Sequence, residues 1–194
     1  MIYVNKVISS KNYVNYSSIT RCVNMISDTI HTLGLCNGKI CAPSINISLN
    51  KCNIRSGISC WPFLDSNSFT CSLTYSSFAD NHATGYDCFW LNTEGAKYEI
   101  KVANPQERIG TLGTEGTICT RGNLMIQDSC ILENKANCIF YQASSYTITI
   151  SNCTVDKTTS YRSFKIQNTV TKSFIHALNH MSTRNCHSEY DSAG

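Results

Sequence analysis

Acidic residues recur shortly after the apolar runs of this chain, and they are the first residues to test for chemistry. Asp80, Glu133 and Asp156 each lie six or seven residues past the last apolar residue of such a run. A polysaccharide-cleaving enzyme needs several carboxylates, alone or with Arg or Lys, that converge on one face for acid–base work or Ca²⁺ binding. In the repeat that lies between Asp80 and the other two acidic residues, the equivalent position is apolar. Glu133 and Asp156 have Lys135 and Lys157 close by. We therefore interpret these residues as solvated turns with exposed ion pairs, and we expect no enzymatic activity.

Histidines near the C-terminus form the one sequence pattern that resembles a metal-binding site. His176 and His180 are four residues apart and would share a face of a helix, and Cys186 and His187 follow. Four ligands of these types can hold zinc. The glutamate of an H-E-x-x-H motif is absent, and the apolar pattern of the chain fades here. We expect adventitious spacing, with no metal and no cofactor.

Twelve cysteines are many for a cytosolic protein and few for a small disulfide scaffold. No C-x-x-C pair exists, which argues against a zinc ribbon or a redox motif. Cys52 and Cys153 are predicted to share one turn position. Another group is predicted to lie near the second strand of successive repeats: Cys41, Cys60, Cys88, Cys119 and Cys138. Two interpretations remain open, a ladder of small buried thiols and a set of disulfides between neighbouring repeats.

Three N-x-S/T sequons provide candidate N-glycosylation sites at Asn15, Asn46 and Asn152. Asn46 is predicted to point outward from a strand and Asn152 to lie in a turn. These positions matter only if the chain is secreted.

The elements that would position these residues follow from an apolar repeat. In the stretch 146–155, Tyr146, Ile148 and Ile150 alternate with Thr147 and Thr149, as in a half-buried strand. We expect the two threonines on an outward face shared with other repeats. Stepping back from Ile150 by about 24 residues at a time, with one longer step, reaches further apolar anchors. They are Ile126, Val102, Leu73, Leu49 and Met25.

Each anchor is followed, three residues later, by a small or turn residue: Asp28, Cys52, Ser76, Pro105, Ser129 and Cys153. Apolar residues return two positions further on, except at Glu107, and a second short apolar run lies in the latter half of each repeat. One repeat therefore reads as a strand, a sharp turn, a short strand and a loop.

A repeat of this kind buries its apolar positions only by stacking on its neighbours. The sequence predicts an all-β fold, a right-handed single-stranded parallel β-helix of about six to seven coils. A leucine-rich-repeat solenoid is the alternative, because 47–54 and 148–155 fit its strand core. The apolar residue expected before that core is missing, however, and the rest of each repeat is aromatic and β-branched. We expect a partial coil in 1–18, repeats in 19–170, and a decayed last coil or cap in 171–194, the end of a truncated chain.

Composition and charge exclude several classes of function. A net charge of +3, with 15% charged residues, is too low and dispersed for a nucleic-acid footprint. No apolar run approaches the length of a membrane span, and the N-terminal residues do not form a secretory signal.

Two short motifs resemble a known family. Phe78-Ala-Asp-Asn81 resembles the F-x-x-N motif of polymorphic outer-membrane-protein repeats, and Ile131-Leu-Glu-Asn134 is a variant of it. The partner motif G-G-A-I of that family has only a remnant, around Gly116. Over 22–166 the chain is similar to right-handed β-helix surface proteins of protozoan parasites.

This resemblance implies a cell-surface or secreted chain that adheres to a host or matrix protein or to a glycan. A non-enzymatic adhesion role is therefore our expectation, with a degenerate carbohydrate-active, pectate-lyase-like β-helix as the alternative. Three or more carboxylates within reach of a groove would favour the enzyme.

Overall fold

The computed structural model describes residues 2–5, 10–24, 31–52, 55–65, 67–83, 89–109, 116–132, 134, 136, 138–143, 145–155, 158–162 and 164–171. Within these residues the chain is a parallel β-solenoid, so the predicted all-β class and β-helix architecture are confirmed. The described residues include strands on a third side and no α-helix, unlike a leucine-rich repeat with helices on its convex face.

Sheet A has seven parallel strands, each contributed by a successive coil. In stacking order they are β1 (Ile2–Asn5), β5 (His31–Cys36), β9 (Arg55–Trp61), β11 (Phe89–Leu91), β13 (Ile118–Thr120), β16 (Phe140–Gln142) and β19 (Ser160–Tyr161).

Sheet B bends and supplies the other two sides of the solenoid. Its main path is β2 (Lys11–Tyr13), β6 (Lys39–Pro43), β10 (Phe69–Ala83), β12 (Lys97–Ile109), β14 (Asn123–Gln127), β17 (Ile148–Ser151) and β20 (Phe164–Gln167). Side strands add to it: β3 (Ser18–Thr20), β4 (Val23–Asn24), β7 (Asn46–Ser48) and β8 (Lys51–Cys52).

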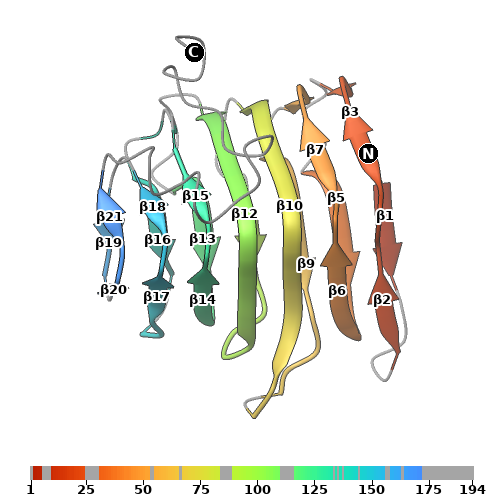
Figure 1. Ribbon diagram of the computed structural model, residues 1–194. Coiled ribbons are helices and arrows are strands. Elements are labelled where there is room, and N and C mark those ends of the chain that lie inside the picture. Colours follow the sequence, from red (N-terminus) through yellow and green to blue (C-terminus); the bar gives the residue numbers. More distant parts are fainter. Residues whose placement is uncertain are drawn as a thin grey trace, which may run out of the picture.

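The long strands β10 and β12 run around the bend without interruption, since β10 pairs with β6 in its first part and with β7 and β8 in its second. We call the side before the bend face B and the side after it face C. A small sheet continues face C beyond β12: β15 (Cys130–Ile131), β18 (Thr154–Val155) and β21 (Val170–Thr171). Figure 1 shows the strands side by side, from β1 and β2 in red to β19, β20 and β21 in blue.

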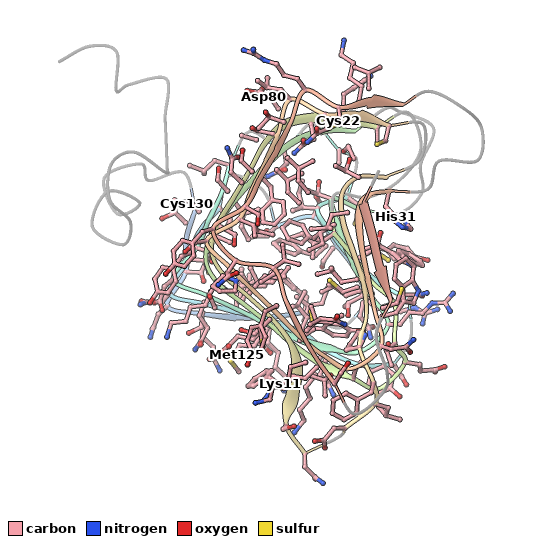
Figure 2. All side chains as sticks on the ribbon, turned by 90° about the vertical axis from the view of Figure 1, so that its right-hand side faces the viewer. Lys11, Cys22, His31, Asp80, Met125 and Cys130 are labelled. Carbon is pink, nitrogen blue, oxygen red and sulfur yellow. The ribbon has the colours of Figure 1, made fainter. Side chains whose placement is uncertain are left out.

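The three sides enclose one continuous apolar core. Viewed along the stack, side chains fill the interior, while Lys11 and Met125 lie on one side and His31 on another (Figure 2). Equivalent strands contribute inward residues in register, such as Ile58, Phe89 and Ile118 of sheet A, all fully buried. Phe89 also meets Phe78 from face C, with ring centroids 4.4 Å apart. The solenoid thus solves the burial problem that one repeat cannot solve alone.

The corner between face B and face C repeats the same chemistry. A residue with positive φ is followed, in five coils, by a hydroxyl or thiol that donates to the carbonyl two residues before it. The positive-φ residues are Tyr16, Ser44, Tyr75, Asp128, Asn152 and Asn168. The donors are Ser17, Ser76, Ser129, Cys153 and Thr169, at 2.6 to 3.2 Å. We call this the hydroxyl corner; it confirms Ser76, Ser129 and Cys153 as turn residues at one position.

The regular spacing of the anchors is only partly right. Ile126 and Ile150 are partners, as predicted. Leu73, however, pairs with Ile100 and Ala42, so Val102 and Leu49 are wrong anchors. Leu49 is a corner residue with φ 58° and an exposed side chain. Met25 lies outside the described residues.

The cause is that coil length is not constant. On face B, the strand partners of successive coils include Ile40 with Cys71, Lys97 with Asn123, and Ile148 with Phe164. The separation in sequence is longest for the first of these pairs and shortest for the last. A fixed period therefore loses register at the longer coils, and Cys52, beside Ala83, does not share the position of Cys153.

Candidate functional site

The carboxylates singled out by the sequence do not form a described site. Asp80 is an exposed residue with φ 51°, at a second corner of β10 between the residues that pair with β7 and those that pair with β8. Glu133 and Asp156, with Lys135 and Lys157, lie outside the described residues. The candidate metal ligands His176, His180, Cys186 and His187 also lie outside them. In the described ranges, no group of three or more His, Cys, Asp or Glu could hold a metal ion.

The sequons occupy the kinds of position that their patterns predict. Asn15 and Asn46 are exposed, and Asn46 points outward between the buried Ile45 and Ile47. Asn152 is half-buried at the hydroxyl corner, where its amide donates to the Asp128 carboxylate at 2.8 Å. Glycosylation at these three positions stays a prediction.

The ten described cysteines are thiols rather than disulfides, and Cys88 lies outside the described residues. Cys60 and Cys119 are fully buried, as a set of small buried thiols requires, but they do not stack as a ladder, because Cys60 pairs with Leu91 and Cys119 pairs with Trp90 and Tyr141. Cys41 lies instead on the outer side of β6, because its neighbour Ile40 takes the core position. Burial raises the pKa of the Cys153 thiol to about 11, and also raises that of Cys52. These two thiols are poor nucleophiles at neutral pH.

The F-x-x-N motif has a structural explanation. Phe78 and Asn81 are both fully buried, and the Asn81 amide donates to the Ile47 carbonyl at 2.8 Å. Its oxygen accepts from the backbone and side-chain nitrogens of Asn50, at 3.1 and 2.9 Å. Asn50 in turn donates to the carbonyl of Ile19 in the preceding coil, at 2.9 Å. We call this row the asparagine corner. Its side-chain amides are hydrogen-bonded to neighbouring coils, so they are not available to bind a ligand.

An open groove of about 380 Å³ lies on the outer side of face B, across five successive strands, β10, β12, β14, β17 and β20. Its lining is amide, hydroxyl, ammonium and apolar: Asn67, Phe69, Lys97, Asn123, Leu124, Met125, Thr147, Thr149 and Lys165. Leu124 is a core residue of β14 that borders the groove. Alternation explains why the lining residues beside it on β12, β14 and β17 face outward, since Tyr98, Leu124 and Ile148 occupy the core.

The strand register arranges the floor of the groove as two rows. In the first, Lys97 on β12 pairs with Asn123 on β14, and the Asn123 side chain accepts from the Thr147 backbone at 3.1 Å. In the second, Met125, Thr149 and Lys165 are direct partners on β14, β17 and β20. The prediction that Thr147 and Thr149 belong to a shared outer face is confirmed.

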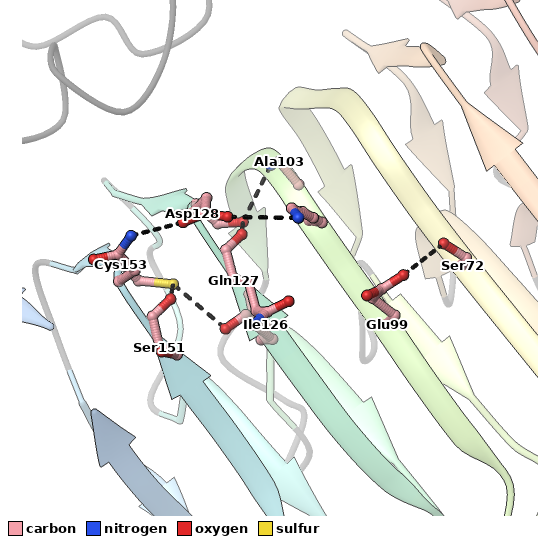
Figure 3. A network of polar contacts seen from close by, with 11 residues as sticks. Ser72, Glu99, Ala103, Ile126, Gln127, Asp128, Ser151 and Cys153 are labelled. Atoms are coloured by element: carbon pink, nitrogen blue, oxygen red, sulfur yellow. Dashed lines mark hydrogen bonds and ion pairs between the residues drawn. The ribbon is translucent and has the colours of Figure 1, made fainter. Parts of the chain in front are cut away.

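Three carboxylates lie around the groove, and each has partners of its own. Glu99 accepts from the Ser72 hydroxyl at 3.1 Å, toward β10 (Figure 3). Asp128 accepts from Asn152 and lies 3.9 Å from the Lys101 ammonium (Figure 3).

The third carboxylate is Asp65, in the loop before β10. It accepts from the Ser68 hydroxyl at 2.6 Å and from the Asn67 backbone at 2.8 Å. These bonds, with a smaller contribution from the charge of Lys97, lower the pKa of Asp65. The lining residues themselves contribute two lysines and no carboxylate.

Most groove residues were not recognised from the sequence. Only Thr147 and Thr149 were placed outward, because they alternate with the clearest apolar run. The same alternation around Tyr98 and Leu124 predicts outward positions for Lys97 and Asn123. That Lys165 lies on the same groove depends on the unequal lengths of the coils. A fixed repeat length in the sequence does not reveal it.

The described residues include no helix with the length and apolar character needed to cross a bilayer. A scan against protein-family models, a search of curated proteins and a search of solved structures each find no match. What is shown of the family resemblance is therefore the β-helix architecture alone.

Proposed function

We propose that this chain is a non-enzymatic binding module of a cell-surface or secreted protein, and that it adheres through the outer side of face B. The observation that carries the proposal is the groove across β12, β14, β17 and β20. It is a concave, side-chain-lined surface of the kind on which ligands bind, and its amide, hydroxyl and ammonium groups can set the orientation of a ligand.

The form of the surface supports binding rather than catalysis. Backbone groups in the middle of a parallel sheet are already paired, so recognition falls to side chains. The lining side chains are amides, hydroxyls, ammoniums and apolar groups, which bind but do not supply a carboxylate acid–base pair. Placement at the cell surface rests on the resemblance of the F-x-x-N motif and on the exposure of Asn15 and Asn46.

The test is an adhesion measurement with a variant that fills the groove. Beads carrying the purified chain are washed over surfaces coated with matrix proteins or with defined glycans. Thr149→Trp places a large side chain on the groove floor, whatever the charge of the ligand. Thr20→Trp is the matched control, because Thr20 is an exposed strand residue on face C.

We expect at least one coated surface to retain the wild-type and control beads and to release the Thr149→Trp beads. Equal retention of both variants would show that the groove is not the adhesive surface. Failure of the wild-type chain to bind any coating, together with turnover of a polysaccharide, would replace the proposal with the degenerate enzyme.

A further inference from the structure

The groove on face B has a charge pattern that points to the class of its ligand; this inference rests on the proposed binding function. Lys97 begins one row of the floor and Lys165 ends the other. They are separated by three strand spacings along the solenoid, about 14 Å at the usual distance between paired strands. Between them lie neutral residues, Asn123, Thr147 and Thr149.

This pattern favours an anionic ligand of low charge density. Two ammonium groups belong to the lining, and the nearest carboxylates, Glu99 and Asp65, are engaged by Ser72 and by Ser68 with Asn67. A densely charged polymer would call for a cluster of Lys and Arg. Two cations spaced across a neutral floor match a chain with isolated negative groups.

The floor also favours a sugar polymer over a peptide. An extended peptide gains most of its affinity from the exposed edge of a sheet, and β14 and β17 are interior strands with partners on both sides. The groove crosses five strands and offers amide and hydroxyl groups along its floor. Phe69 and Met125 add apolar surface against which a sugar ring can pack.

We infer that the groove binds a linear carboxylated polysaccharide, with the sugar chain running across β12, β14, β17 and β20 and its carboxylates at Lys97 and Lys165. The ligand lies along the solenoid, perpendicular to the strands. Hydroxyls of the sugars between the charged ends bond to Asn123, Thr147 and Thr149.

The experiment compares two double variants that remove the same charge from the same sheet. Lys97→Gln with Lys165→Gln changes the groove. Lys11→Gln with Lys39→Gln is the control, because these two residues pair on β2 and β6, away from the groove. The probe is a linear polyuronate in which each uronate alternates with a neutral sugar. Its binding to the full chain is measured by calorimetry, and unfolding in urea checks that both variants are folded.

We expect the groove variant to weaken polyuronate binding at least about tenfold, because it removes both charged hydrogen bonds to the ligand carboxylates. The control should stay within about twofold of wild type. A neutral linear polysaccharide should bind wild type more weakly than the polyuronate does, and rising salt should reduce that difference.

Several outcomes would overturn the inference. They are an equal loss in the control variant, tighter binding of a sulfated polysaccharide, or equal binding of polyglutamate or a single-stranded oligonucleotide. If a neutral glycan or a matrix protein binds and Thr149→Trp alone abolishes that binding, the adhesion function stands and the acidic ligand is wrong. If no probe or coating binds, both are wrong.

Discussion

The asparagine corner and the groove on face B are both polar rows that run along the solenoid, yet they differ in burial and in hydrogen bonding. Asn50 and Asn81 are fully buried, and their amides bond to backbone and to each other across coils. Lys97, Asn123 and Thr149 stand on an open outer surface. A polar residue that recurs in a repeat is therefore structural when it is buried and saturated, and becomes a candidate for binding when it faces solvent.

The largest expected effect lies beside the asparagine corner. Phe78→Ala removes a fully buried ring in contact with Phe89, and it should lower the free energy of unfolding by about 3–5 kcal/mol. Urea unfolding measures the change. Tyr13→Ala is the control, since the Tyr13 side chain is 59% exposed, and it should change stability by less than about 0.5 kcal/mol. Similar values for the two variants would contradict the assignment of Phe78 to the core.

The asparagine corner itself is tested by Asn81→Ala. The substitution removes three hydrogen bonds and leaves the backbone N–H and one side-chain N–H of the buried Asn50 without an acceptor. We expect a loss of about 1–3 kcal/mol in unfolding free energy. Asn46→Ala, at an exposed amide 3.5 Å from the Ser18 hydroxyl, should have little effect. Equal unfolding free energies for the two variants would contradict the structural role assigned to the buried asparagines.

A pH-dependent effect should come from the hydroxyl corner. Burial, the main cause, raises the pKa of the Cys153 thiol from 9.0 to about 11, so folding favours its neutral form. The stabilisation is complete below pH 9 and is lost as the pH rises through 11. By pH 10, wild type should lose about 1.4 kcal/mol relative to Cys153→Ser. The difference in urea midpoint between the two proteins, followed from pH 7 to pH 10, measures it; parallel curves would refute it.

The smallest expected effect is at the border of the groove. Lys101 and Asp128 are 3.9 Å apart with side chains 42% and 30% exposed, so Lys101→Ala should cost less than about 0.5 kcal/mol. It should also leave polyuronate binding within about twofold, because Lys101 does not line the groove. Calorimetry on the variant measures the affinity. A tenfold loss would show that the binding site includes Lys101.

The β-helix could be predicted because its local signals are strong. The alternation of 146–150 and the small residues Ser76, Ser129 and Cys153 correctly identify strands and a repeated turn. The register could not be derived with a fixed period, because the coils shorten from the N-terminal part of the stack to the C-terminal part. This is why Leu49 was placed in a strand although it occupies a corner.

The site was harder to predict than the fold. The outward position of Thr147 and Thr149 follows from one strand alone. The placement of Lys97 and Lys165 along one groove depends on the lengths of three intervening coils, which no local pattern contains. The F-x-x-N motif was noticed as a signature, but the cross-coil bonds of Asn81 to Asn50 and Ile47 appear only when the coils are stacked.

The varying coil length has a consequence for protein engineering. The hydroxyl corner keeps the same short geometry from coil to coil, whereas the segments that enter and leave sheet A take up the differences in length. These segments include the loop between β9 and β10 and the shorter loop between β13 and β14. The side of the solenoid opposite the hydroxyl corner is therefore the natural place to graft foreign peptides. An insert at the start of the loop between β9 and β10, ahead of Asn67, would lengthen one coil and keep the strand spacing of face B.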